Sequence, residues 1–123
     1  MKFNLIDLVV YTPIIELNNI KAAEKLSPDV KIFAKAEFLN PSGSVKDRAA
    51  RGMILHGIET GELTKKKTIL DSTSGNTGVA YAMFGAALGY KVKLFMPSNA
   101  SMERKKVIRA YGAEIVETDP LEG

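Results

Sequence analysis

Two short polar loops carry the residue types that could do chemistry. The first, residues 40–48, places Lys46 at the start of an expected helix, after an approach rich in glycine and serine. The second, residues 72–78, contains only hydroxyl, amide and small side chains ahead of another expected helix. A lysine amine can act as a nucleophile or a base, and a glycine-containing loop at a helix start can bind an anion. The two loops are therefore the candidate functional segments.

The loop at residues 72–78 favours anion binding. Glycine lets the backbone approach a ligand closely, and the free N–H groups and the helix dipole at a helix start attract a carboxylate or a phosphate. The alternative is that the serine and threonine side chains only cap the helix. Capping explains any one of these residues, but it explains seven such residues in a row poorly.

Lys46 has two interpretations. A lysine in the first turn of a helix is usually a solvated surface residue. The helix dipole disfavours its charge there, however, which would help to keep the amine neutral and nucleophilic if it were also desolvated. Such an amine suits a Schiff base. The neighbouring Asp47 and Arg48 are expected to form a local ion pair or to be helix-start residues, and neither is assigned a chemical role.

The elements around these loops alternate between strand and helix, which is typical of an α/β fold with a parallel twisted sheet and flanking helices. Strands are expected at residues 30–38, 68–71, 91–96 and 114–117. Apolar stripes at helical spacing predict helices that end at Gly61, Gly89 and Gly112, the last of them capped by Ser101. Both polar loops then follow a strand and precede a helix, where open α/β sheets bind ligands.

Composition excludes several classes of protein. The chain has 123 residues, of which 46% are hydrophobic and 25% charged, as in one soluble globular domain. A net charge of +3 is too small to indicate nucleic-acid binding. The basic clusters at residues 65–67 and 104–106 are interpreted as solvated faces, so Lys105 and Lys106 are expected on the surface. His56 is expected to be structural.

Membrane and redox chemistry are not indicated. The sequence has no cysteine, so it can form neither a disulfide nor a thiolate metal site. The longest apolar stretch, residues 79–88, is far shorter than the ~20 residues of a membrane span. The N-terminus lacks the pattern of a signal peptide. A cytoplasmic protein is the expectation.

Taken together, residues 40–48 and 73–78 resemble the two N-terminal signatures of the cysteine synthase family. Residues 12–17 resemble the opening strand of that family, and residues 96–97, 103–104 and 111–114 resemble the family's sequence after its second signature. The resemblance implies the tryptophan-synthase β type (fold type II) of pyridoxal 5′-phosphate (PLP) enzyme. Residues 1–123 would be a single N-terminal domain that holds the PLP lysine and the substrate carboxylate.

The resemblance also implies roles for individual residues. Lys46 would hold PLP covalently and remove the α-proton of the amino acid, and Asn76 would hydrogen-bond the ring hydroxyl oxygen of the cofactor. The substrate carboxylate would be bound by Thr73, Ser74, Gly75 and Thr77. The implied reaction is β-replacement, in which sulfide displaces the leaving group of an activated serine such as O-acetylserine to give L-cysteine.

Two departures from the family pattern stand out. Residues 8–11 replace a glycine usual before the opening Thr-Pro. The second departure is larger, because the family's C-terminal domain, with its Gly/Thr-rich phosphate-binding loop, is expected to be missing here. The chain alone is therefore expected to be inactive. It would be either a truncated product or one chain of a split enzyme. Its candidate protein partners are a C-terminal chain or further copies of itself. Strands near Ile14 and Ile32 are expected to leave unpaired edges and exposed apolar surface.

Other functions stay open. Cystathionine β-synthase, threonine synthase and the serine/threonine dehydratases share the implied fold and cofactor. From a different class, the chain could be a non-catalytic module that binds a carboxylate or a protein tail at residues 73–77. Enzymes of the family bind the C-terminal tail of serine acetyltransferase in this region, which makes such a tail a further candidate partner.

Overall fold

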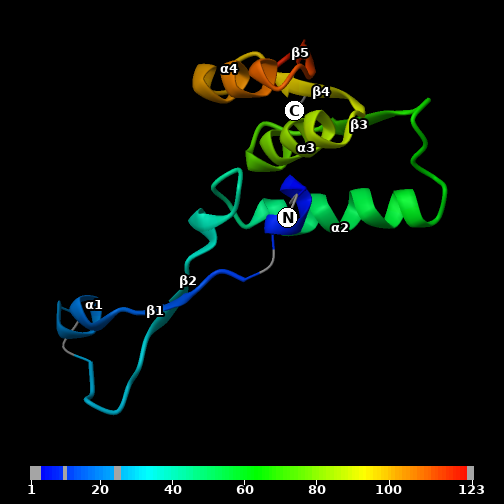
Figure 1. The fold of residues 1–123 in the computed structure, drawn as a ribbon. Coiled ribbons are helices and arrows are strands. Elements are labelled where there is room, and N and C mark those ends of the chain that lie inside the picture. Colours follow the sequence, from blue (N-terminus) through cyan, green and yellow to red (C-terminus); the bar gives the residue numbers. More distant parts are fainter. Residues whose placement is uncertain (1–3, 10, 24–25, 122–123) are drawn as a thin grey trace.

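The structure is a computed structural model that describes residues 4–9, 11–23 and 26–121, with side chains left undescribed at 21–23. Its elements, in chain order, are η1 (Leu5–Leu8), β1 (Ile14–Glu16), α1 (Asn18–Ala23), β2 (Phe33–Lys35), η2 (Glu37–Leu39), α2 (Lys46–Glu59), β3 (Thr68–Ser72), α3 (Asn76–Leu88), β4 (Lys91–Pro97), α4 (Met102–Ala110) and β5 (Glu114–Thr118). From α2 onward they form an α/β unit, and β1, α1 and β2 form an arm that extends away from it (Figure 1).

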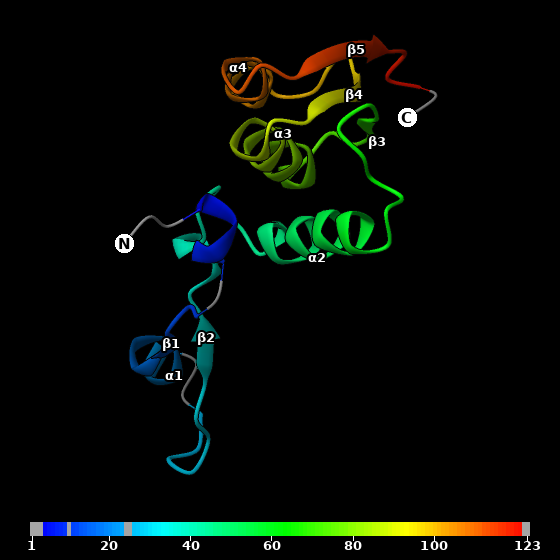
Figure 2. The same ribbon diagram turned by 45° about the vertical axis from the view of Figure 1, so that its right-hand side comes forward.

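The α/β unit is built on a parallel sheet in the order β3-β4-β5. The strands predicted at residues 68–71, 91–96 and 114–117 are confirmed, each extended by one residue. Figure 2 shows α3 and α4 together on one face of this sheet. Val92, Leu94 and Met96 alternate along β4 and are buried, as expected for the covered face of a strand. The α/β fold with a parallel sheet is confirmed.

α3 is the central element of the core. Every residue from Gly78 to Gly85 is buried, because the helix lies between the sheet and α2, and a helix enclosed in this way is apolar on all sides. A Cβ on Gly85 would lie 2.2 Å from Cγ2 of Val92, so only glycine allows this close approach of α3 to β4. The helix ends at Gly89, as predicted, in a left-handed conformation with φ of 70°.

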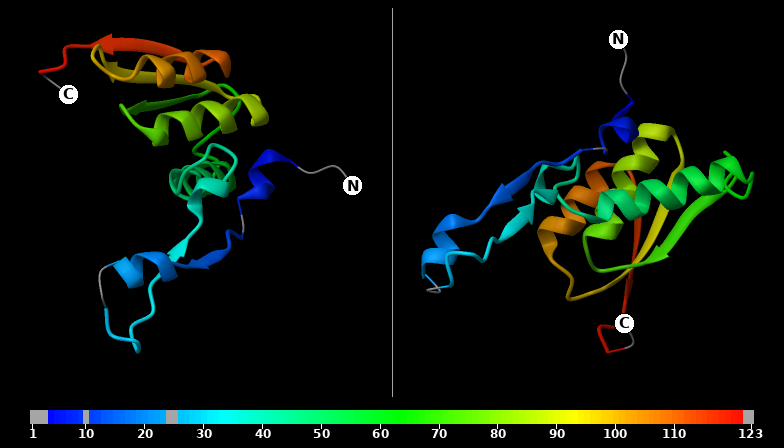
Figure 3. Two further views of the ribbon diagram at one scale, coloured as in Figure 1. Left: turned by 90° about the vertical axis from the view of Figure 1, so that its left-hand side faces the viewer. Right: turned by 90° about the horizontal axis from the view of Figure 1, so that it is seen from below.

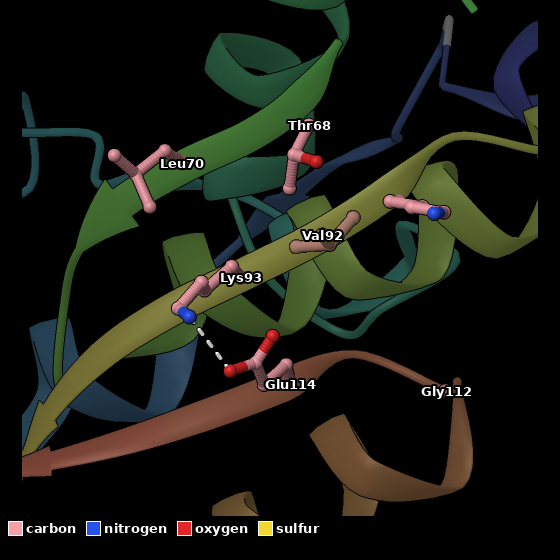
Figure 4. Close-up of a pocket in the computed structure, with 7 residues that line it drawn as sticks. Thr68, Leu70, Val92, Lys93, Gly112 and Glu114 are labelled. Carbon is pink, nitrogen blue, oxygen red and sulfur yellow. Dashed lines mark ion pairs between the residues drawn. The ribbon is translucent and has the colours of Figure 1, made fainter. Parts of the chain in front are cut away.

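The opposite face of the sheet is open among the described residues. Leu70 is 63% exposed there, and Lys93 of β4 forms an ion pair of 2.7 Å with Glu114 of β5. Figure 4 shows these side chains lining a shallow depression over the strands. The described helices that flank the sheet therefore cover a single face of it.

The arm is a two-stranded antiparallel sheet formed by β1 and β2, and Figure 3 shows it standing clear of the α/β unit. The strand predicted at residues 30–38 is shorter than expected, because the chain turns into η2 at Glu37. Ile14, Ile15 and Phe33 are exposed, which confirms the expected apolar surface on the N-terminal strands.

Lys105 corrects a prediction. The basic cluster around it predicts a surface position, but its side chain is only 1% exposed. Its Nζ donates to the carbonyl oxygen of Ser98 at 2.7 Å and lies 3.1 Å from Oε1 of Glu117. A buried lysine must be paired and hydrogen-bonded, and here the pairing ties α4 to the ends of β4 and β5. The Lys105 side chain therefore links α4 to the edge of the sheet. Lys106 is exposed, as expected.

None of the helices in the described part of the chain is both long and apolar enough to cross a bilayer.

Candidate active site

Lys46 is the first residue of α2, as predicted, and the loop before it is held by buried Asp47. The Asp47 carboxylate accepts hydrogen bonds from the backbone N–H of Ser42, at 2.7 Å, and from the Ser42 hydroxyl. Ser44 Oγ accepts a further bond from the backbone N–H of Lys46 at 3.1 Å. The backbone of Lys46 is therefore fixed, while its side chain is exposed. The described residues do not supply the desolvation that would make its amine a strong nucleophile.

A cluster of four side chains joins the arm to the same end of α2. The Glu37 carboxylate accepts from Nε of Arg48 at 2.9 Å and 3.1 Å, from Nδ2 of Asn40 at 2.6 Å and from the Thr12 hydroxyl at 3.1 Å. Arg48 Nη2 also donates to Oγ1 of Thr12 at 3.0 Å. Asp47 and Arg48 are thus helix-start residues with different partners. Asp47 fixes the loop at Ser42, and Arg48 fixes the segments that carry Thr12 and Glu37. Sequence reasoning missed this cluster, because no local spacing links Thr12, Glu37 and Arg48.

The cluster predicts how stability depends on acid. Hydrogen bonds from Arg48, aided by Asn40 and Thr12 and opposed by burial, lower the pKa of Glu37 from 4.5 to about 2. A carboxylate with a lowered pKa in the folded state stabilises the fold above the unfolded-state pKa, and this contribution is lost as pH falls through the folded pKa. In thermal unfolding, Glu37→Gln should therefore lower the midpoint at neutral pH. The difference from wild type should shrink between pH 4.5 and about 2.

The control for this prediction is Glu16→Gln, which removes a carboxylate from an exposed position on β1. It should leave the midpoint nearly unchanged at neutral pH. A Glu37→Gln deficit that stayed constant down to pH 2 would contradict the assignment of the lowered pKa of about 2.

The second loop runs from the end of β3 to the start of α3. The N-cap of α3 is Gly75, and no side chain caps its first turn. The interpretation that these residues only cap the helix is therefore not supported there, and the N–H groups of the first turn are left for another acceptor. Ser74 and Asn76 are exposed and Thr73, Gly75 and Thr77 are half-buried. Ser72, Thr73, Ser74, Gly75 and Pro97 line a shallow open pocket at this edge.

Thr73, which lines this pocket, is also closely packed against α3. A Cβ on Gly78 would lie 2.8 Å from Cγ2 of Thr73 and 3.1 Å from Cδ1 of Leu94. Only glycine at position 78 lets α3 pass so near the threonine. The loop and the helix therefore determine each other's positions, and the Thr73 side chain is fixed.

The tertiary structure brings the two predicted loops to one side of the molecule. α2 packs on α3, and both helices begin on the same side, which is where the chain leaves β3 (Figures 1 and 3). An exposed amine at Lys46 and an exposed carboxamide at Asn76 thus stand at two neighbouring helix starts. This donor set fits PLP at its aldehyde and ring-oxygen end, since an amine can bond an aldehyde carbon and an amide N–H can donate to a phenolic oxygen. Across the residues described, no cluster of three or more His, Cys, Asp or Glu could hold a metal ion.

A parallel α/β domain with a helix-start lysine and an anion-type loop at the strand ends defines a class of ligand-binding enzyme domain. Residues 5–123 match the family described as pyridoxal-phosphate dependent enzyme, and the chain belongs to that family. Its members depend on PLP, which confirms the cofactor inferred from the resemblance.

Several relatives of this chain are cysteine synthases. It is 50% identical over 119 residues to a cysteine synthase of Aquifex aeolicus, covering 97% of this chain and 36% of that protein. It is 40% identical over 118 residues to the cystathionine beta-synthase of Saccharomyces cerevisiae, covering 95% of this chain and 23% of that protein. The crystal structure of a cysteine synthase from Entamoeba histolytica matches with a TM-score of 0.93 at 36% identity, covering 100% of this chain and 36% of that chain. The chain spans little more than a third of the length of the cysteine synthases it matches.

Proposed function

We propose that this chain forms the PLP-lysine and substrate-carboxylate part of a cysteine synthase. The reaction replaces the leaving group of an activated serine, such as O-acetylserine, with sulfide to give L-cysteine. The observation that carries the proposal is the placement of Lys46 and the uncapped start of α3 on one side of the molecule. Membership of the PLP family and 50% identity to a cysteine synthase support it.

In this proposal each site residue has a defined role. The hydroxyls of Thr73, Ser74 and Thr77 bind the carboxylate of the amino acid beside Gly75, whose missing side chain leaves room for it, because they lie at the uncapped start of α3. The Asn76 carboxamide orients the cofactor by donating to its ring oxygen. Thr73 is fixed against Gly78, which gives the carboxylate site a rigid side.

Lys46 would hold the cofactor through Nζ, and the same amine, released when the amino group of the substrate takes its place, would transfer protons. Bound PLP supplies an electron sink for the α-carbon of the amino acid. Lys46 Nζ takes the proton from that α-carbon before the leaving group departs, and returns a proton to it after sulfide has added. Because Lys46 is exposed among the described residues, water must be excluded by groups that cover it in the complete enzyme.

We further infer that residues 1–123 work together with a C-terminal domain, in the same or another polypeptide, that supplies the phosphate-binding loop. The cysteine synthase of Aquifex aeolicus is matched over 36% of its length. Exposed apolar side chains on the arm and on the open face of the sheet, among them Ile14, Phe33 and Leu70, support this inference because such surface is usually covered in a complete protein. An amino acid is the proposed small-molecule partner.

A second candidate is cystathionine β-synthase, which the likeness to the Saccharomyces cerevisiae enzyme favours. Turnover of O-acetylserine with sulfide is the test, compared with turnover of serine with homocysteine. It is measured with the chain alone and with the complete protein that contains it. We expect the complete protein to make cysteine from the first pair at a rate well above the second, and the chain alone to be inactive.

Faster turnover of serine with homocysteine would replace the first proposal by the second. Activity of the chain alone would overturn the inferred need for a C-terminal domain.

A further inference from the structure

Arg104 on α4 reaches the loop assigned to the substrate carboxylate. Its Nη1 donates to the carbonyl oxygen of Ser74 at 3.4 Å, across thirty positions of sequence. The sequence indicates only that Arg104 belongs to a solvated basic cluster. Its side chain is on the surface, but the structure gives it a definite partner in the candidate site.

This contact continues through a series of hydrogen bonds. The carbonyl group of Ser74 and the N–H group of Gly75 belong to one planar trans peptide unit, so they point in opposite directions. The N–H of Gly75 donates to Oγ1 of Thr73 at 3.3 Å. A guanidinium bonded to the carbonyl oxygen of Ser74 therefore also orients the N–H of Gly75, which donates to Thr73.

The same series of hydrogen bonds leaves the proton of the Thr73 hydroxyl free for donation. A hydroxyl oxygen that accepts a hydrogen bond keeps its own proton free for another acceptor. Hydrogen bonds arranged in series also polarise one another, so a cation at one end strengthens the donor at the other end. The Thr73 hydroxyl is thereby directed and strengthened as a donor to an anion, although Arg104 itself does not touch that anion.

The base of Arg104 is held firmly. Ser101, the N-cap of α4, accepts a hydrogen bond from the backbone N–H of Arg104 at 3.5 Å. The next residue is the buried Lys105, bonded to Ser98 and paired with Glu117. The start of α4 is thus tied to the ends of β4 and β5, and the guanidinium extends from a fixed backbone.

We propose that Arg104 is a positioning residue for recognition of the amino-acid carboxylate. It acts through the Ser74–Gly75 peptide on the hydroxyl of Thr73, and it raises the preference for a carboxylate over an uncharged amide. This inference rests on the proposed function, because it takes residues 73–77 as the carboxylate site.

The experiment measures binding of L-serine and of L-serinamide to the complete, PLP-loaded protein by titration calorimetry. L-serinamide has an uncharged amide where L-serine has its carboxylate. Arg104→Met should weaken L-serine binding about tenfold, within the usual range of coupling between neighbouring sites, and should leave L-serinamide binding unchanged. Lys106→Met is the matched control, since it removes one exposed cation from the same helix, and it should change neither affinity.

One further variant separates positioning from charge, and a measurement of unfolding separates positioning from folding. Arg104→Lys keeps the charge but loses the forked guanidinium, so it should also lose L-serine affinity; full retention would mean that charge alone acts and would overturn the proposal. The unfolding midpoint of Arg104→Met should equal that of Lys106→Met. A loss of affinity for both ligands together would indicate a merely structural role and would also overturn it.

Thr73→Val distinguishes this proposal from the proposed function. If Thr73→Val lowers the preference for L-serine and Arg104→Met does not, the carboxylate site stands and the role of Arg104 is rejected. If Thr73→Val has no effect, the carboxylate site itself is misplaced and both ideas are rejected. Support requires that adding Arg104→Met to Thr73→Val causes no further loss, because both changes then act on one group.

Discussion

Replacing Lys46 with alanine should abolish attachment of PLP at this position and lower turnover by the complete enzyme about 10²- to 10⁴-fold, the usual contribution of a positioned acid–base group. Borohydride reduction of the PLP-loaded complete enzyme, followed by peptide mass mapping, measures the attachment. In wild type the label should concentrate on Lys46. The exposed side chain of Lys46 makes alanine there nearly neutral for stability, so the loss would report on chemistry.

Lys66→Ala is the control for this variant, because it removes another exposed lysine that lies outside both candidate loops. It should leave the labelling of Lys46 and the turnover unchanged. Label spread evenly over many lysines in the wild-type enzyme, together with full activity of the Lys46→Ala enzyme, would show that another residue holds the cofactor.

Phe84→Ala should destabilise the chain by about 3–5 kcal/mol, the usual cost of removing a large buried aromatic side chain. Phe84 is 0% exposed, and it lies in the helix enclosed by the sheet and α2. A domain of this size has a stability of about 5–15 kcal/mol, so the change removes a large share of the total. The midpoint and slope of urea-induced unfolding measure it.

The matched control is Phe38→Ala, which removes the same side chain from a position that is 64% exposed. Its effect should stay within about 0.5 kcal/mol, as for most surface substitutions. Equal losses from the two variants would mean that α3 does not form the core of the folded chain. An unchanged urea slope in both variants would show that the unfolded states are alike.

Local patterns in the sequence predicted the elements of the α/β unit and the position of the second loop, whereas the loop before Lys46 follows η2 rather than the expected strand. The stripe along residues 80–88 and the glycine after it specify α3 and its end, because helix periodicity and a left-handed C-cap are properties of neighbouring residues. Alternation along residues 91–96 specifies β4 in the same way. The place of Lys46 at a helix start followed from its local sequence, and the resemblance to the cysteine synthase family followed from two short motifs.

Predictions failed where the environment comes from distant segments. Residues 30–38 alternate as a strand should, yet the chain turns at Glu37, whose carboxylate bonds Arg48 and Thr12. Lys105 looked like a surface charge because the sequence around it is basic, and the fold instead buried it against Ser98 and Glu117. Both outcomes depend on partner groups that lie outside the helix or strand concerned.

The sequence by itself determined the helices and strands of the α/β unit, the two loops and the PLP family, because each of these depends on the order of neighbouring residues. The tertiary structure alone decided that Glu37 binds the arm to α2 and that Arg104 reaches Ser74. The physical reason is that a polar side chain takes its partners from the groups that lie near it in space. For Glu37 and Arg104 those groups are brought close only when the arm, the helices and the sheet pack together.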